Sequence, residues 1–239
     1  MEDLGLYFVI ALALLFMTWY FIGRQLNLKR QKIMWKSISD TIKKYSKRVN
    51  YRSLGSTGFQ ISFLGKPPVS MIELTLINLD RENLLHYLIQ KLSGKRDQVY
   101  LKASFTCNPT INLKTGKPGE KLDIVDGVEV SGLNIYSDNP PLAKKLLLSE
   151  KIQKDLMEVQ GLTGLSISPR EPHLIMRCNF DPETVSRILK FSRDLGKVLC
   201  SSAGGGKHHI HHLQHILLSL RLNYYLYLPP RFVAVEAYG

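Results

Sequence analysis

Five histidines lie close together near the C-terminal end of the 239-residue sequence: His208, His209, His211, His212 and His215. On a helix, His208 with His212 and His211 with His215 would form i,i+4 pairs, a spacing that can hold a transition-metal ion. Apart from Cys200, which lies across a glycine-rich stretch, no carboxylate or thiol nearby completes such a site. We therefore predict an exposed polar helix face with no metal or cofactor. A membrane-tethered metal-binding sensor or enzyme that uses residues 208–215 is the alternative.

Other patterns typical of catalysis are incomplete. Residues 204–207 (GGGK) resemble a phosphate-binding loop, but Ser201 stands where the first glycine is needed and His208 follows the lysine. The sequence contains no H-E-x-x-H, G-x-S-x-G or dinucleotide-binding fingerprint. Since no spacing singles out a Ser-His-acid triad either, we predict no catalytic residues and a protein that is not an enzyme.

The three cysteines are scattered through the chain. Cys107, Cys178 and Cys200 show no C-x-x-C spacing. An odd, scattered set suits a reducing compartment and argues against a disulfide framework.

An uncharged apolar run at residues 4–22 dominates the N-terminal end. As a helix it would cover roughly 28 Å, about the thickness of the hydrocarbon core of a bilayer. Trp19 and Tyr20 are predicted to lie at the membrane interface, where amphipathic rings are enriched. Glu2 and Asp3 replace the basic start of a cleaved signal peptide, so we predict a retained transmembrane anchor over residues 1–22.

A strongly basic segment follows the apolar run. Residues 23–52 carry ten basic side chains and one acid, out of a net charge of +12 for the chain. The positive-inside rule places residues 23–239 in the cytoplasm and the N-terminus outside. A basic segment beside a membrane can bind anionic lipids or ribosomal RNA, or act only as a topology signal. The candidate binding residues are Lys29, Arg30, Lys32, Lys36, Lys43, Lys44, Lys47 and Arg48.

Apolar spacing predicts that this juxtamembrane segment is a helix, over residues 24–48. Trp35, Ile38, Ile42 and Tyr45 recur at intervals of three and four, which places them on one stripe. We expect the stripe to dock on the rest of the protein while the basic residues stay exposed.

Residues 53–200 alternate between strand and helix patterns, which predicts an α+β domain. Strands are expected at 59–64, 71–78 and 98–106, and a helix capped by Asp80 is expected to extend to residue 92. Shorter strands are expected within 121–137, and helices over 140–148 and 150–159. Residues 201–239 form a Gly/His linker with a terminal helix and strand pieces.

Two stretches of the domain resemble each other. Residues 57–62 (TGFQIS) match 163–168 (TGLSIS), and 78–82 (NLDRE) match 179–183 (NFDPE). We interpret this as a duplicated strand–strand–helix unit, residues 55–93 and 162–199. Both copies are expected to share one mixed or antiparallel sheet, with helices 80–92 and 181–199 on the same face.

The order of these features resembles the calumin family, also called coiled-coil domain-containing protein forty-seven. The resemblance covers roughly residues 6–200 and rests on Trp35, Leu54-Gly55, residues 80–88 (DRENLLHYL) and 97–102 (DQVYLK). It implies a subunit of the PAT complex, a chaperone for multipass membrane proteins. The implied partners are the Sec translocon, a small Asterix-like membrane protein and the ribosome.

The sequence lacks the family's long acidic lumenal region and its basic coiled-coil tail. We therefore expect a short homologue without lumenal calcium binding, in the endoplasmic reticulum membrane of a eukaryote or the cell membrane of a prokaryote.

Overall fold

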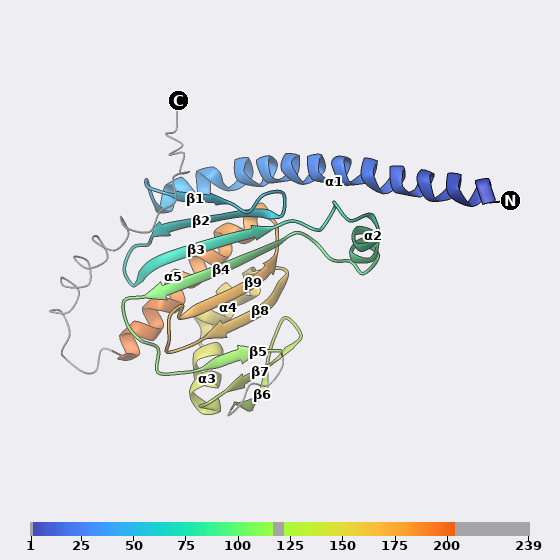
Figure 1. Cartoon of the computed structure of the whole chain (residues 1–239). Coiled ribbons are helices and arrows are strands. Elements are labelled where there is room, and N and C mark those ends of the chain that lie inside the picture. Colours follow the sequence, from blue (N-terminus) through green and yellow to red (C-terminus); the bar gives the residue numbers. More distant parts are fainter. Residues whose placement is uncertain (1, 117–121, 204–239) are drawn as a thin grey trace. The chain divides into compact units, whose positions relative to one another are not determined.

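The computed structural model describes residues 2–116 and 122–203 (Figure 1). Its strands form one nine-stranded sheet in the order β1-β2-β3-β4-β9-β8-β5-β7-β6, and every neighbouring pair is antiparallel. This confirms the predicted α+β class. The elements are α1 (Glu2–Tyr45), β1 (Asn50–Ser53), β2 (Gly58–Leu64), β3 (Val69–Ile77), α2 (Leu84–Leu92), β4 (Gln98–Phe105), β5 (Leu113–Thr115), β6 (Asp123–Val130), β7 (Leu133–Ser137), α3 (Pro140–Leu147), α4 (Glu150–Glu158), β8 (Leu162–Ile167), β9 (Leu174–Asn179) and α5 (Pro182–Ala203).

The sheet buries one face and leaves the other polar. In β2, Phe59, Ile61 and Phe63 are buried, whereas Gln60 and Ser62 between them are partly exposed. The long helix α5 packs across β3, β4 and β9 on the buried face, and α3 and α4 lie on the same side (Figure 1). An antiparallel sheet with one covered face produces the alternating pattern on which the strand predictions depend.

The apolar run and the basic segment form one continuous helix, α1, of 44 residues. Its second half docks on the domain, against α5 and β2. Ile38 and Ile42 are fully buried together with Met34, and Trp35 and Tyr45 pack against them. The predicted docking stripe is therefore confirmed.

The helix ends earlier than predicted. It stops at Tyr45, and residues 50–52, the end of the segment 23–52 that we assigned to the juxtamembrane helix, belong to strand β1 (Asn50–Ser53). Asn50 pairs with Ser62 and Ser53 with Phe59 on β2. The ladder to β2 therefore determines the conformation of this stretch, and no local periodicity could have shown it.

The first half of α1 leaves its apolar side chains exposed. A window of 18 residues has a mean hydropathy of 2.1, and none of it is buried. The helix is therefore long and apolar enough to cross a membrane.

The two proposed repeat units agree in their hairpins and differ in their helices. β2 pairs with β3, and β8 with β9, each as an antiparallel hairpin of one sheet. However, α2 begins at Leu84 with Asn83 as its N-cap, not at Asp80, and it contacts α1. No α2 residue is buried, so the expectation that both helices pack on one sheet face is wrong for α2. The duplication itself stays a hypothesis.

The cysteines also differ from expectation. Cys107, just after β4, and Cys200, near the end of α5, form a disulfide with a Cα–Cα distance of 5.5 Å. Their separation of 93 residues gave no sign of this contact, which exists because α5 packs along β4. The third cysteine, Cys178, is free and buried, and burial raises the pKa of its thiol to about 12.

Truncating Ile38 should test the docking of α1. Ile38→Ala removes a fully buried side chain and should lower the free energy of unfolding by about 2–5 kcal/mol. The control is Ile33→Ala on the same helix, where the side chain is 59 % exposed. The control should change stability by less than about 0.5 kcal/mol. Urea unfolding of the detergent-solubilised protein measures both, and equal losses would contradict the docked arrangement.

Candidate functional site at the junction of α1 and the domain

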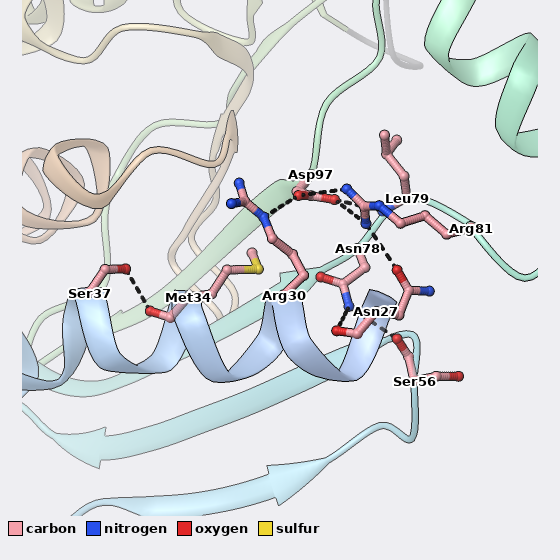
Figure 2. Close-up of polar contacts among 9 residues, drawn as sticks. All are labelled: Asn27, Arg30, Met34, Ser37, Ser56, Asn78, Leu79, Arg81 and Asp97. Carbon is pink, nitrogen blue, oxygen red and sulfur yellow. Dashed lines mark hydrogen bonds and ion pairs between the residues drawn. The ribbon is translucent and has the colours of Figure 1, made fainter. Parts of the chain in front are cut away.

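A buried carboxylate, Asp97, lies where α1 meets the domain (Figure 2). Its side chain is 5 % exposed. Arg81 donates two hydrogen bonds to it, from Nη1 to Oδ1 at 3.0 Å and from Nη2 to Oδ2 at 3.2 Å. The Nε of Arg30 on α1 donates to Oδ2 at 2.9 Å, and the backbone N–H of Leu79 donates to Oδ1 at 2.9 Å. Four N–H donors from two segments, α1 and the loop before α2, therefore converge on one carboxylate.

Arg81 also contacts α1 directly, through its backbone carbonyl and through one more side-chain hydrogen bond. Its carbonyl accepts a hydrogen bond from the indole N–H of Trp19 at 3.0 Å, and its Nη1 donates to Oδ1 of Asn27 at 3.0 Å. Between them, a Cβ at Gly23 would lie 1.9 Å from the same carbonyl oxygen, so only glycine fits. Trp19, Gly23, Asn27 and Arg30 are spaced by three or four residues, so one face of the helix is fastened to one loop.

Two further contacts attach the turn before β2 to the same helix. Asn78 Nδ2 donates to the carbonyl oxygens of Asn27 at 3.3 Å and Ser56 at 3.1 Å. Gln31 Nε2 donates to the carbonyl of Gly55 at 2.9 Å. We name the set Asn27, Arg30, Asn78, Arg81 and Asp97 the Asp97 cluster. It joins α1, the turn after β1, and the two segments that flank α2.

The cluster holds Asp97 in its charged form. Burial by itself raises the pKa of this carboxyl, but the hydrogen bonds from Arg81, Leu79 and Arg30 outweigh burial, and the net pKa is lowered. Both carboxylate oxygens are already occupied by donors that belong to the protein. The arrangement is suited to fixing three segments to one another, and it leaves Asp97 no free lone pair aimed at a substrate.

Two of the residues that we predicted to contact a partner or the membrane interface make contacts within the protein. Arg30, which we expected to be free, forms an ion pair with Asp97 and lies over the ring of Phe180. Trp19 donates its indole N–H to Arg81, with its ring centroid 6.3 Å from that of Tyr87. Tyr20 is exposed, as a residue at a membrane interface would be.

The other predicted binding residues share one property, which is exposure to solvent. This confirms the expectation that they stay exposed when α1 docks on the domain. They are Lys29, Lys32, Lys36, Lys43, Lys44, Lys47 and Arg48.

A second charged group lies between α4 and α5. Lys190 pairs with Asp155 at 2.7 Å and with Glu158 at 3.0 Å, and these two acids raise the pKa of the amine to about 12. The pairs connect two helices that already pack together. Their chemistry is that of a structural ion pair, since a permanently charged amine is a poor general base.

No metal-binding arrangement is found in the described part of the chain. Within residues 2–116 and 122–203, no three His, Cys, Asp or Glu side chains are placed to hold a metal ion. The histidines at 208–215, on which the alternative function depends, lie outside the described residues.

Sequence reasoning missed the central residues of the cluster. Arg81 and Asp97 lie within the stretches that carry the family resemblance, but neither was predicted to be a functional or structural site. The available signal was a charged residue directly before a strand with alternating burial, which is too common to single out a buried ion pair. A search with protein-family models found no match, and no curated protein matches the sequence.

Removing the Asp97 carboxylate should destabilise the junction strongly. Asp97→Ala leaves the largely buried Arg81 without its partner, which should cost about 3–5 kcal/mol of unfolding free energy. The control is Glu73→Gln, which breaks the Glu73–Lys102 pair on the open sheet face. Breaking such an exposed pair should cost at most about 1 kcal/mol. Urea unfolding of both variants measures the difference, and similar costs would show that Asp97 is not the central contact.

The same carboxylate should make stability depend on acidity. Because the folded pKa of Asp97 is lowered, its stabilising contribution is present above the ordinary Asp pKa and is lost as pH falls toward the folded value. The stability difference between wild type and Asp97→Asn should therefore be constant between about pH 5 and 7 and shrink below about pH 4. Unfolding curves over this range test it. A difference that grew on acidification would mean that the sign of the shift is wrong.

Proposed function

We propose that this protein is a membrane-anchored, non-enzymatic adaptor and chaperone subunit that assists the insertion of multipass membrane proteins at the Sec translocon. One observation carries the proposal. The same uninterrupted helix α1 exposes an apolar half long enough to cross a membrane and docks its basic half on the domain. A rigid connection of this kind holds the domain at a set distance and orientation from the bilayer, as an adaptor requires.

The location of the resembling stretches supports the comparison with the calumin family. Gly55 accepts a hydrogen bond from Gln31 on α1, residues 80–88 form the loop and most of α2, and Asp97 starts the DQVYLK stretch. Two of these stretches therefore supply Arg81 and Asp97 to the Asp97 cluster, and the third contacts α1 at Gln31, next to Arg30. Because the resembling stretches lie at this junction, the comparison suits a way of joining anchor and domain that is shared with the calumin family.

Two surfaces suit the proposed partners. The exposed apolar side chains of residues 6–22 suit lipid and another transmembrane helix, such as a small Asterix-like protein or a translocon subunit. The exposed lysines at 43, 44 and 47, with Arg48, suit ribosomal RNA or anionic lipid headgroups.

We propose that the domain faces the cytoplasm. The ten basic residues of 23–52 against one acid favour this orientation. The Cys107–Cys200 disulfide favours the opposite one, since disulfides persist mainly in oxidising compartments, with proteins of hyperthermophiles as an exception. We give more weight to the flanking charge, because it acts directly on the orientation of the helix during insertion.

An introduced cysteine should decide the orientation. Arg170→Cys places a thiol on an exposed turn, while the natural cysteines are bonded or buried. In intact cells, a charged maleimide that does not cross membranes should fail to label this variant, and it should label it after permeabilisation. The control is Glu2→Cys, which precedes the apolar run and should be labelled without permeabilisation. The reverse pattern would place the domain outside.

Copurification should test the partners. Affinity purification from gently solubilised membranes should recover Sec channel and ribosomal components. Replacing Lys43, Lys44, Lys47 and Arg48 with Gln should reduce the recovered ribosomes most at low salt and should make the recovery less dependent on salt, because fewer phosphates are neutralised. Folding should be nearly unaffected, since exposed charges contribute little to stability.

A charge-matched variant serves as the control. Replacing Lys66, Lys145, Lys154 and Arg170 with Gln removes the same charge from exposed positions elsewhere, and ribosome recovery should stay at the wild-type level. Recovery of neither partner by the wild type would contradict the adaptor function. Equal recovery by the first variant across a salt series would contradict only the RNA contact.

A further inference from the structure

Helix α2 exposes an apolar stripe that the rest of the domain does not cover. Leu85, Leu88, Ile89 and Leu92 are spaced as i, i+3, i+4 and i+7, so they lie on one face. All four are exposed, Leu92 to 87 %, and no residue of α2 is buried. Sequence periodicity predicts burial for such a face, but nothing in the described part of the chain covers it.

The opposite side of α2 is held by the protein. The Tyr87 ring contacts the ring of Trp19 on α1. The Arg81 guanidinium also lies over the Tyr87 ring, 5.9 Å from the ring centroid. His86 contacts Asp80 at 3.0 Å and Gln90 at 3.1 Å, and the Asn83 side chain caps the helix. The helix is therefore seated against α1 with its apolar stripe turned away from these contacts.

The position of α2 along α1 is set by the same contacts. The indole of Trp19, which Tyr87 touches, lies near the C-terminal end of the apolar run. In Figure 1 α2 is seen nearly end-on while α1 runs across the picture, so the two helices lie steeply inclined to each other. If α1 crosses a bilayer, α2 lies at headgroup level and roughly parallel to the membrane surface.

We propose that α2 is a second membrane contact, an interfacial helix that inserts its Leu85–Leu92 stripe into the headgroup region of the bilayer that α1 spans. The contact between Tyr87 and Trp19 places α2 beside the end of the exposed apolar surface of α1, and this position identifies lipid as the occupant of the stripe. Lys91, Lys95 and Arg96 are exposed at the end of α2, where they suit anionic headgroups. The proposal rests on the membrane span of α1, and it adds a second point of attachment that limits tilting of the domain.

A fluorescent probe at Leu92 tests this with the full-length protein. Leu92→Cys labels selectively, because Cys107 and Cys200 are bonded and Cys178 is buried. The probe is a nitrobenzoxadiazole maleimide, and the protein is reconstituted in vesicles of phosphatidylcholine and phosphatidylglycerol. Nitroxide lipids carry the quencher either near the headgroup or near the end of the acyl chain. The matched control is Thr163→Cys, exposed on the open sheet face.

The expected result at position 92 is blue-shifted emission that the shallow nitroxide quenches more strongly than the deep one. Position 163 should emit as in water, without quenching. A probe at Leu12→Cys, in the apolar run, should be quenched most by the deep nitroxide. Quenching at 12 without any at 92 would overturn the inference and leave the anchor intact. Blue-shifted emission at 92 that no lipid quenches would mean that protein covers the stripe, which also overturns it. Lack of quenching at 12 would contradict the anchor itself.

Discussion

The arrangement of this protein depends on keeping one buried carboxylate charged. Taking Asp97 out of water is unfavourable unless donors surround it, and the fold supplies them from Arg30 on α1, from Arg81 and from the backbone of Leu79. The donors belong to α1 and to the loop before α2, and Asp97 itself directly precedes β4. The need to satisfy Asp97 therefore fixes the position of α1, of the loop before α2 and of the start of β4 relative to one another.

The apolar contacts of α1 and the Asp97 cluster have different roles. Met34, Ile38 and Ile42 supply the burial that keeps α1 on the domain, but hydrophobic contact is not directional. The hydrogen bonds of Asn27, Arg30 and Trp19 are directional, and the close approach at Gly23 allows no sliding. Together they give a helix that is held both tightly and in one register. Under the proposed adaptor function, this register decides which surfaces face the bilayer.

The same junction explains why α2 can remain unburied. Its connecting segments are fixed through Asp80, Arg81 and Asp97, so the helix does not need a core of its own to hold its place. The disulfide between Cys107 and Cys200 fastens the far end of β4 to α5, on which the buried face of the sheet packs. The strand β4 is thereby tied at both ends, to α1 at Asp97 and to α5 just after Phe105.

The sequence alone determined the features that depend on local periodicity and charge. The uncharged run before Gly23, the stripe from Trp35 to Tyr45 and the alternating strands β2, β3 and β4 could all be predicted, because burial on one face imposes a period of 3.6 or 2 on the residues. Exposure of Lys43, Lys44 and the other bases followed from the same stripe. What covers the exposed apolar face of α2 could not be derived this way, since periodicity shows that a face is apolar and not what covers it.

Tertiary structure alone decided the rest. Strand β1 exists because β2 offers it an edge, and Cys107 meets Cys200 because α5 runs along β4. Arg30 looked like one more exposed base until Asp97, 67 positions away, proved to lie beside it. The contacts of Cys107 and Arg30 join residues that are distant in sequence, and no local pattern encodes them. They arise because desolvated charges, cysteines and strand edges take the partners that packing of the whole chain brings within reach.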